Sequence, residues 1–286
     1  MKIGVTLGFS QHTPPADVLA VARAAEERAF HSLWVPEHVL FFREYASRYP
    51  YSDTGRIPGE PTGVLDPFIA LTYVAAHTSR IRLGTGICIV PQRAPVYTAK
   101  MVADLDYLSG GRLDFGIGVG WLAEEFDALG LAFDDRGPAT DECLDAMKAL
   151  WAGDPAEHAG PRFSFSGALL NPKPVQQPHP PIIVGGESRP AYRRVAERGQ
   201  GWYGFDQTSE RFAACVRDLD AALAAARRSR AEIQIYVSPR GRIDAEGVAF
   251  YRGQGVDQLI VPTMGRDLDA VLRRMDQLLD VVRDAA

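Results

Sequence analysis

The chain has 286 residues, of which 46% are hydrophobic and 23% charged, and its formal net charge is −5. This composition is typical of a folded globular protein and excludes a disordered or fibrous chain. The acidic balance argues against a nucleic-acid-binding protein, because such proteins carry an excess of basic residues.

No apolar run approaches the ~18 residues that a membrane span requires, and the first residues lack the features of a secretory signal. The three cysteines (Cys88, Cys143 and Cys215) are too scattered for a disulfide framework or a zinc site. We therefore expect a cytoplasmic protein without a membrane partner and without a metal.

Short runs rich in β-branched residues alternate along the chain with longer segments of helical period. Eight such runs predict strands, at 3–8, 32–36, 81–89, 113–118, 181–185, 201–205, 233–238 and 257–262. Each run is nearly apolar throughout, which indicates strands covered on both faces. Eight strands, each followed by a helix, predict an α/β fold of the (β/α)8 TIM-barrel type over residues 1–286. A doubly wound open sheet is the structural alternative.

Insertions follow the second and the fourth strand. Residues 39–64 are rich in aromatic side chains and come directly after the second strand, so we expect them to form a lid at the C-terminal end of the barrel. Residues 122–135 predict a short extra helix ending at Gly130. Residues 153–180 contain six prolines and the hairpin-like stretch RFSFSGALL, and are interpreted as an excursion before strand five.

Catalytic groups of such a barrel lie where its strands end. The histidines form no H-x-H or H-x-x-x-H pair, and no lysine is placed at a strand end for Schiff-base chemistry. We therefore expect an organic cofactor to carry the reactive atom. Glu37 and His38 end the second strand and are the catalytic candidates, since His38 can act as a general acid or base near neutral pH. A packed core histidine is the alternative.

Two glycine-rich turns are candidate cofactor contacts. One strand runs into Gly185-Gly186 and a helix begins near Ser188, so the free N–H groups of Gly186, Glu187 and Ser188 predict a cradle for a phosphate. The alternative is a turn in which Ser188 only caps the helix. Glycines also end the fourth strand, where they would let a flat ring approach the backbone or let the strand pack closely against a helix.

The sequence is similar to the luciferase-like monooxygenase superfamily over roughly residues 2–205, and most similar to its deazaflavin (coenzyme F420)-dependent branch. The resemblance rests on SLWVPEH, SRIRLGTGI, LDYLSGGRLDFGIGVGW, EEFDALG and NPKPVQQPHPPIIVGG, in that order. It implies a barrel that binds a flavin or deazaflavin at its C-terminal face, a non-prolyl cis peptide at Gly86-Ile87 beneath the ring, and a homodimer.

The resemblance and the residue patterns together give one expected site. His38 would lie beside the reactive edge of the ring. The expected cofactor-binding residues are Gly86, Ile87, Gly118, Gly120, Trp121, Gly185, Gly186, Glu187 and Ser188. The expected substrate-binding residues are Phe9, Phe41, Phe42 and Tyr45.

Two departures from the branch bear on cofactor and substrate. Many deazaflavin-dependent members have Asp before the histidine, where this chain has Glu37, so FMN is the alternative cofactor. Sugar-phosphate dehydrogenases of the branch have a glutamate where Trp121 stands, which argues against a sugar phosphate as substrate.

Three functions follow as hypotheses. The first is an F420-dependent oxidoreductase that moves a hydride between C5 of the deazaflavin and an apolar organic small molecule. The second is an FMN-dependent monooxygenase that uses oxygen and separately supplied reduced flavin. The third is a barrel that binds a cofactor or ligand without catalysis.

Overall fold

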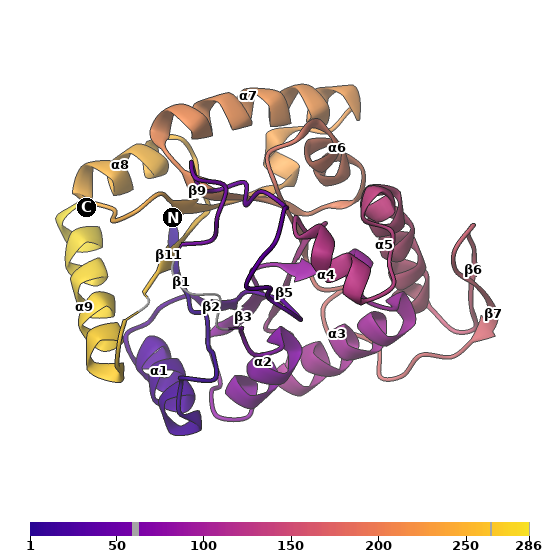
Figure 1. The fold of residues 1–286 in the computed structure, drawn as a ribbon, viewed down its shortest axis with the longest axis horizontal. Helices are drawn as coiled ribbons and strands as arrows, with labels where there is room; N and C mark the ends of the chain where they lie inside the picture. The colour runs from indigo at the N-terminus through magenta and orange to yellow at the C-terminus, as the bar shows by residue number, and fades with distance from the viewer. Residues whose placement is uncertain (59–62, 264, 286) are drawn as a thin grey trace.

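The computed structural model describes residues 1–58, 63–263 and 265–285. Parallel strands stand in the order β3-β2-β1-β11-β10-β9-β8-β5, and the pairing of β3 with β5 closes them into an eight-stranded barrel (Figure 1). The strands are β1 (Lys2–Thr6), β2 (Ser32–Val35), β3 (Arg82–Thr85), β4 (Cys88–Ile89), β5 (Leu113–Gly118), β8 (Ile182–Gly185), β9 (Gly201–Gln207), β10 (Gln234–Pro239) and β11 (Gln258–Pro262). The predicted barrel is confirmed, and the open-sheet alternative is wrong.

The predicted third strand is divided in two. The cis peptide between Gly86 and Ile87 lies between β3 and β4, where the family resemblance placed it. β3 pairs with β2 and with the start of β5, whereas β4 pairs with the end of β5. The chain therefore bulges at the C-terminal end of the barrel between these two short strands.

Helices surround the barrel and cover its outer face (Figure 1). They are α1 (Pro15–Glu27), α2 (Pro67–Ala75), α3 (Pro95–Ser109), α5 (Arg136–Ala152), α6 (Arg189–Arg198), α7 (Ser209–Ala225), α8 (Ala245–Gly253) and α9 (Leu268–Asp284). Several begin at a side-chain cap that accepts a hydrogen bond from the first turn, as Asp66 does for α2 and Ser188 for α6. No helix in the described ranges is both long enough and apolar enough to cross a bilayer.

Two clusters of buried side chains stabilise this arrangement. The larger lies between the strands and the surrounding helices, and the smaller consists of Trp34, Ile183, Tyr203, Tyr236 and Ile260. Side chains of successive strand residues point to opposite faces, which explains why the strands are apolar throughout.

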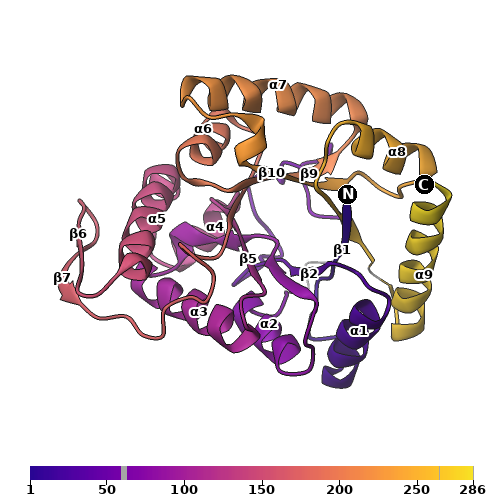
Figure 2. The same ribbon diagram turned by 180° about the vertical axis from the view of Figure 1, so that it is seen from behind.

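The excursion before the fifth barrel strand forms a small antiparallel hairpin, β6 (Ala156–Ala159) and β7 (Ser164–Ala168). It stands apart from the barrel beyond α5 (Figure 2). The stretch RFSFSGALL supplies only the second of its strands. The short extra helix is also present, as α4 (Ala123–Ala128), but it ends before Gly130.

Candidate functional site

His38 follows β2 and makes a polar contact at each ring nitrogen. Its Nδ1 lies 3.1 Å from Oε2 of Glu125, and its Nε2 accepts a hydrogen bond of 3.3 Å from the indole N–H of Trp121. An indole nitrogen can only donate, and an ionised carboxylate can only accept. The imidazole is therefore held with its proton on Nδ1 and with Nε2 as an acceptor. Phe41 packs against the ring at a centroid distance of 4.4 Å.

Glu125 lies in the first turn of α4 and has a fully buried side chain. Besides His38, it accepts hydrogen bonds from the amides of Val39 (2.6 Å) and Leu40 (3.0 Å) and from Nε2 of Gln92 (2.9 Å). Burial alone would raise the pKa of Glu125, but the contact with His38 and the other donors outweigh it and lower the pKa below its ordinary value. Glu125 is thus an ionised carboxylate surrounded by donors.

Glu124, the neighbour of Glu125, binds a later part of the same loop. Its Oε1 accepts hydrogen bonds from the amides of Ala46 (2.5 Å) and Ser47 (3.2 Å). Burial opposes ionisation of Glu124, but hydrogen bonds from Ser47 and from backbone amides lower its pKa to about 2. Two adjacent carboxylates of α4 therefore fasten residues 39–47 to the C-terminal end of the barrel.

Aromatic rings continue from this corner across the barrel end. The ring centroid of Trp121 lies 5.7 Å from Tyr45 and 5.2 Å from Tyr49, Tyr49 lies 5.6 Å from Tyr51, and Tyr51 lies 4.9 Å from Phe205. In Figure 1 this loop, drawn in purple, crosses in front of the strands. Residues 39–58 thus cover the barrel end, as expected of a lid, whereas the predicted lid residues 59–62 lie outside the described part of the chain.

Glu37 does not face His38. Its side chain is 1% exposed, its Oε1 accepts hydrogen bonds from the guanidinium of Arg93, and its Oε2 accepts one from the amide of Ile89 (2.5 Å). Arg93 also binds Asp66, the cap of α2. A buried carboxylate occupied in this way has a structural role in holding β2, β4 and α2 together, which replaces the catalytic role expected from the sequence.

The glycines at the end of β5 have a packing explanation. A Cβ on Gly118 would come within 2.4 Å of the Ile87 side chain, and one on Gly120 within 2.9 Å of Phe126 and 3.0 Å of Ile89. Protein side chains approach these positions so closely that they need glycine, and the expected contact of Gly118 and Gly120 with a cofactor stays a prediction. Ile87 also lies near Gly185, where a Cβ would be 3.2 Å from its Cγ2. The side chain of Ile87 thus lies between the ends of β5 and β8, where it could support a bound ring.

The predicted phosphate cradle has the expected strand–turn–helix form. Gly186 has φ +111°, a conformation that favours glycine, and the Ser188 side chain caps α6 by accepting from the amide of Ala191 (3.4 Å). Within the described residues, nothing accepts a hydrogen bond from the amides of Gly186, Glu187 or Ser188. These free donors at the positive end of α6 suit a phosphate.

The loop reaches this cradle through Tyr51. The Tyr51 ring lies 5.6 Å from the guanidinium of Arg211, which pairs with Glu187 (3.3 Å). The carboxylate of Glu187 also accepts a hydrogen bond from the amide of Phe205 (3.1 Å). Burial raises the pKa of Tyr51 well above its ordinary value, with a contribution from Glu187. Nearby, Oε1 of Gln207 is buried without a partner in the described structure. The free amides fit a phosphate and the unpaired oxygen of Gln207 fits a hydroxyl group, as in the tail of a flavin nucleotide, while Arg211 is already paired with Glu187.

The expected substrate-binding residues divide into two groups. Phe41 lies against His38, and Tyr45 against Trp121, although the Tyr45 hydroxyl accepts a bond from the amide of Ile57 (3.0 Å) within the loop. Phe42 is half-buried in the same loop. Phe9 is only 2% exposed and belongs to the cluster between strands and helices. Its side chain therefore lies in the core, and not at a substrate site as expected from the sequence.

Sequence reasoning missed Glu125, Glu124 and Gln92. The stretch EEF directly after the strand-four glycines was the available signal, because it puts two acids in the first turn of a helix. Carboxylates there face the free N–H groups of a helix start and of nearby loops. Only the fold shows that the loop beside these two acids is the one that follows His38.

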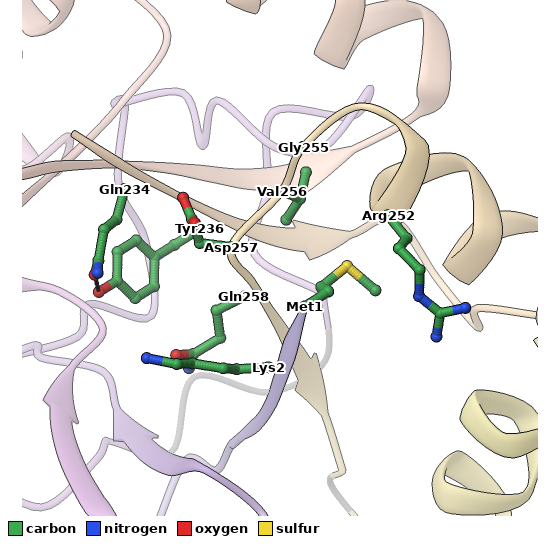
Figure 3. A pocket seen from close by; sticks show the side chains of 9 residues that line it. All are labelled: Met1, Lys2, Gln234, Tyr236, Arg252, Gly255, Val256, Asp257 and Gln258. Carbon is green, nitrogen blue, oxygen red and sulfur yellow. Dashed lines mark hydrogen bonds between the residues drawn. The ribbon is translucent and has the colours of Figure 1, made fainter. Parts of the chain in front are cut away.

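The barrel also has cavities at its opposite, N-terminal end. One of about 370 Å³ is lined by residues such as Lys2, Gln234, Tyr236 and Gln258 (Figure 3). A second of about 560 Å³ shares the first three of these residues. Their linings carry Lys2 and Arg82 together with Asp114 and Asp257, so charges of both signs are present. This end of a TIM barrel normally serves stability rather than catalysis.

The chain is similar to known proteins in sequence and in fold. The family model for luciferase-like monooxygenases matches residues 1–243. An uncharacterised protein of Mycobacterium tuberculosis is 35% identical over 185 residues, 64% of this chain and 65% of that protein. The FMNH(2)-dependent dimethylsulfone monooxygenase of Pseudomonas putida is 38% identical over 154 residues, 52% of this chain and 42% of that enzyme. The alignments thus span less than two thirds of these relatives' lengths.

Among solved structures, a monooxygenase from Streptomyces bottropensis superposes with a TM-score of 0.79 at 23% identity, covering 99% of both chains. At this identity the likeness concerns the fold.

Proposed function

The chain belongs to the luciferase-like monooxygenase family, and on that premise we propose that it is a monooxygenase that uses reduced FMN to oxidise a small organic molecule. The observation that supports this most is the placement of His38 and of the free amides after β8 at the same end of the barrel, joined by one loop. A tricyclic cofactor with a phosphate tail has one group for each of them, a reactive ring for His38 and a phosphate for the amides.

Reduced FMN replaces the deazaflavin that the sequence analysis put first. A named relative, 38% identical over half of this chain, is an FMNH(2)-dependent enzyme. Glu37, where many deazaflavin-dependent members have Asp, is consistent with this choice. The F420-dependent hydride transfer becomes the alternative that the experiment below must separate.

Each part of the proposed site has a task that its chemistry permits. The amides of residues 186–188 and the N-terminus of α6 would bind the phosphate, and Ile87 would support one face of the ring. Bound reduced flavin supplies two electrons to oxygen, so that one oxygen atom enters the substrate and the other leaves as water. His38 would take up or return a proton at Nε2.

The loop of residues 39–58 would exclude water from the reaction. Because Tyr51 contacts Phe205 and Arg211 beside the cradle, this part of the loop would lie next to a bound phosphate. The side chains of Glu124 and Glu125 would hold the beginning of the loop in place.

Anaerobic titration with reduced FMN and with reduced F420, followed by oxygen-uptake assays over a panel of small organic compounds, tests the proposal. We expect binding of reduced FMN and substrate-dependent oxygen consumption. Binding of F420 alone, with hydride transfer, would favour the first hypothesis, and cofactor binding without turnover would favour the third. The homodimer implied by the resemblance stays a prediction, checked by light scattering on the same preparation.

A further inference from the structure

We propose that Glu125 is a positioning residue, which fixes the proton of His38 on Nδ1 and joins the orientation of that ring to the closed position of the loop. The inference rests on the proposed function, in which His38 Nε2 must be free of a proton to accept one. It concerns a residue that neither the motif analysis nor the comparisons single out.

The hydrogen-bond set of Glu125 leaves little choice of arrangement. Oε1 accepts from the amides of Val39 and Leu40, and Oε2 accepts from Gln92 Nε2 and faces His38 Nδ1. All these neighbours point N–H groups at the carboxylate, so the N–H of the imidazole must do the same. The proton of His38 is therefore on the nitrogen that faces Glu125.

The orientation of the Gln92 amide supports the inference that the neighbours of Glu125 donate hydrogen bonds to it. Its amide turns Nε2 toward Glu125, and its Oε1 is then buried without a hydrogen-bond partner among the described residues. The opposite orientation would bring two acceptor oxygens together. In the observed orientation Gln92 donates a hydrogen bond to Glu125 even though its own oxygen is left unpaired.

The other ring nitrogen is left as an acceptor toward the loop side. In the structure His38 Nε2 accepts from Trp121, whose ring also contacts Tyr45 and Tyr49. Val39 and Leu40 directly follow His38, so one carboxylate fixes both the imidazole and the backbone that carries it. The same carboxylate therefore keeps His38 Nε2 free to accept a hydrogen bond and holds the first residues of the loop against α4.

Glu125→Gln tests this role with little change in shape. The Gln oxygen can still accept from Val39 and Leu40, while its NH2 group faces His38 and must donate to Nδ1. The proton of His38 then moves to Nε2, and the indole of Trp121 loses its acceptor. Gln92 can accommodate the change by turning its amide so that Oε1 accepts.

Glu124→Gln is the matched control. Glu124 lies in the same helical turn and also binds the loop, through Ala46 and Ser47, but it does not touch His38. The Glu124→Gln variant therefore shows the effect of weaker loop attachment on the His38 spectrum when Glu125 is unchanged.

The main readout is the ¹⁵N spectrum of the His38 imidazole in cofactor-free protein, which distinguishes a proton on Nδ1 from one on Nε2. We expect the proton on Nδ1 in the wild type and in Glu124→Gln, and on Nε2 in Glu125→Gln. A wild-type proton on Nε2 would overturn the proposal without any variant, as would the same spectrum in wild type and Glu125→Gln, or a shift of the proton in Glu124→Gln.

Turnover gives the second readout. With a substrate found by the oxygen-uptake assay, Glu125→Gln should lower kcat about 10- to 100-fold with little change in KM, a loss within the range of general acid–base catalysis. An unchanged kcat would contradict the positioning role. If the wild type shows no flavin-dependent turnover while the ¹⁵N result holds, the proposed function fails and the assignment of Glu125 stands.

Discussion

The cradle after β8 and the corner around His38 lie at the same end of the barrel, but their parts come from different distances along the chain. The cradle is made by residues 185–191, in which a strand, a glycine turn and a helix cap follow one another. The hydrogen-bond partners of His38 are instead Trp121 and Glu125, which lie 83 and 87 residues away in the sequence.

The difference separates two kinds of dependence on the fold. The cradle keeps its shape as long as β8 runs into α6, because its donors are backbone amides. The corner formed by His38, Trp121 and Glu125 requires α4 to pack beside the loop after β2. It also depends on the buried carboxylate of Glu125. We therefore expect substitutions in the two regions to affect different measurements.

The largest expected effect is on turnover from His38→Ala. Removing the group that exchanges a proton should lower kcat by about 10²- to 10⁴-fold, whereas the Kd for FMN should change only a few-fold because the cradle is untouched. Steady-state kinetics and fluorescence titration measure the two quantities. A large loss of FMN affinity would show that the corner and the cradle are not separable in this way.

A buried ion pair supports the His38 corner, so Arg93→Met should lower stability most. Without Arg93, Glu37 keeps a buried charge that no cation balances, and the free energy of unfolding should fall by about 3–5 kcal/mol. Urea unfolding measures it. The double variant Glu37→Gln with Arg93→Met removes the stranded charge and should recover part of the loss. If it recovers nothing, the ion pair is not the reason.

Ser188→Asp tests the cradle alone. Aspartate can still cap α6, but its charge would lie beside a bound phosphate, and the affinity for FMN should fall by about tenfold or more. Riboflavin, which lacks the phosphate, is the control ligand and should bind wild type and variant alike. Equal weakening for both ligands would mean that the cradle does not hold a phosphate.

The smallest effect concerns acid pH and the loop. The pKa of Glu124 is lowered from its ordinary value of 4.5 to about 2, so its attachment of the loop is fully present above about pH 4.5 and is lost as the pH falls toward 2. The amide proton shift of Ala46, followed by NMR at decreasing pH, should report this loss. A transition centred near the ordinary value would show that the hydrogen bonds to Glu124 are weaker than the structure indicates.

The same contrast explains what the sequence could predict. The strands, the helices and the cradle depend on apolar period, capping residues and glycine turns within a few residues. All eight predicted strand regions are present, although the third is divided into β3 and β4. His38 was located because it follows a strand. Its partner Glu125 was not found, since nothing near either residue indicates that a contact across 87 positions will form.

Two other differences have a comparable origin. Glu37 is a catalytic candidate from its position at a strand end, but successive residues there face opposite ways, and the side chain of Glu37 is bound by Arg93. Gly118 and Gly120 were open to two explanations. The bulk of Ile87 and Phe126, which lie far from each other in the sequence, explains the need for glycine by packing, and a contact with the cofactor stays a prediction.

Hydrogen–deuterium exchange with and without reduced FMN tests most directly whether one ligand uses both regions. We expect the flavin to protect three segments together, namely residues 38–51, 118–125 and 185–191. Protection of only one of these segments, or protection confined to residues around Lys2, Gln234 and Gln258 at the other end of the barrel, would contradict the account.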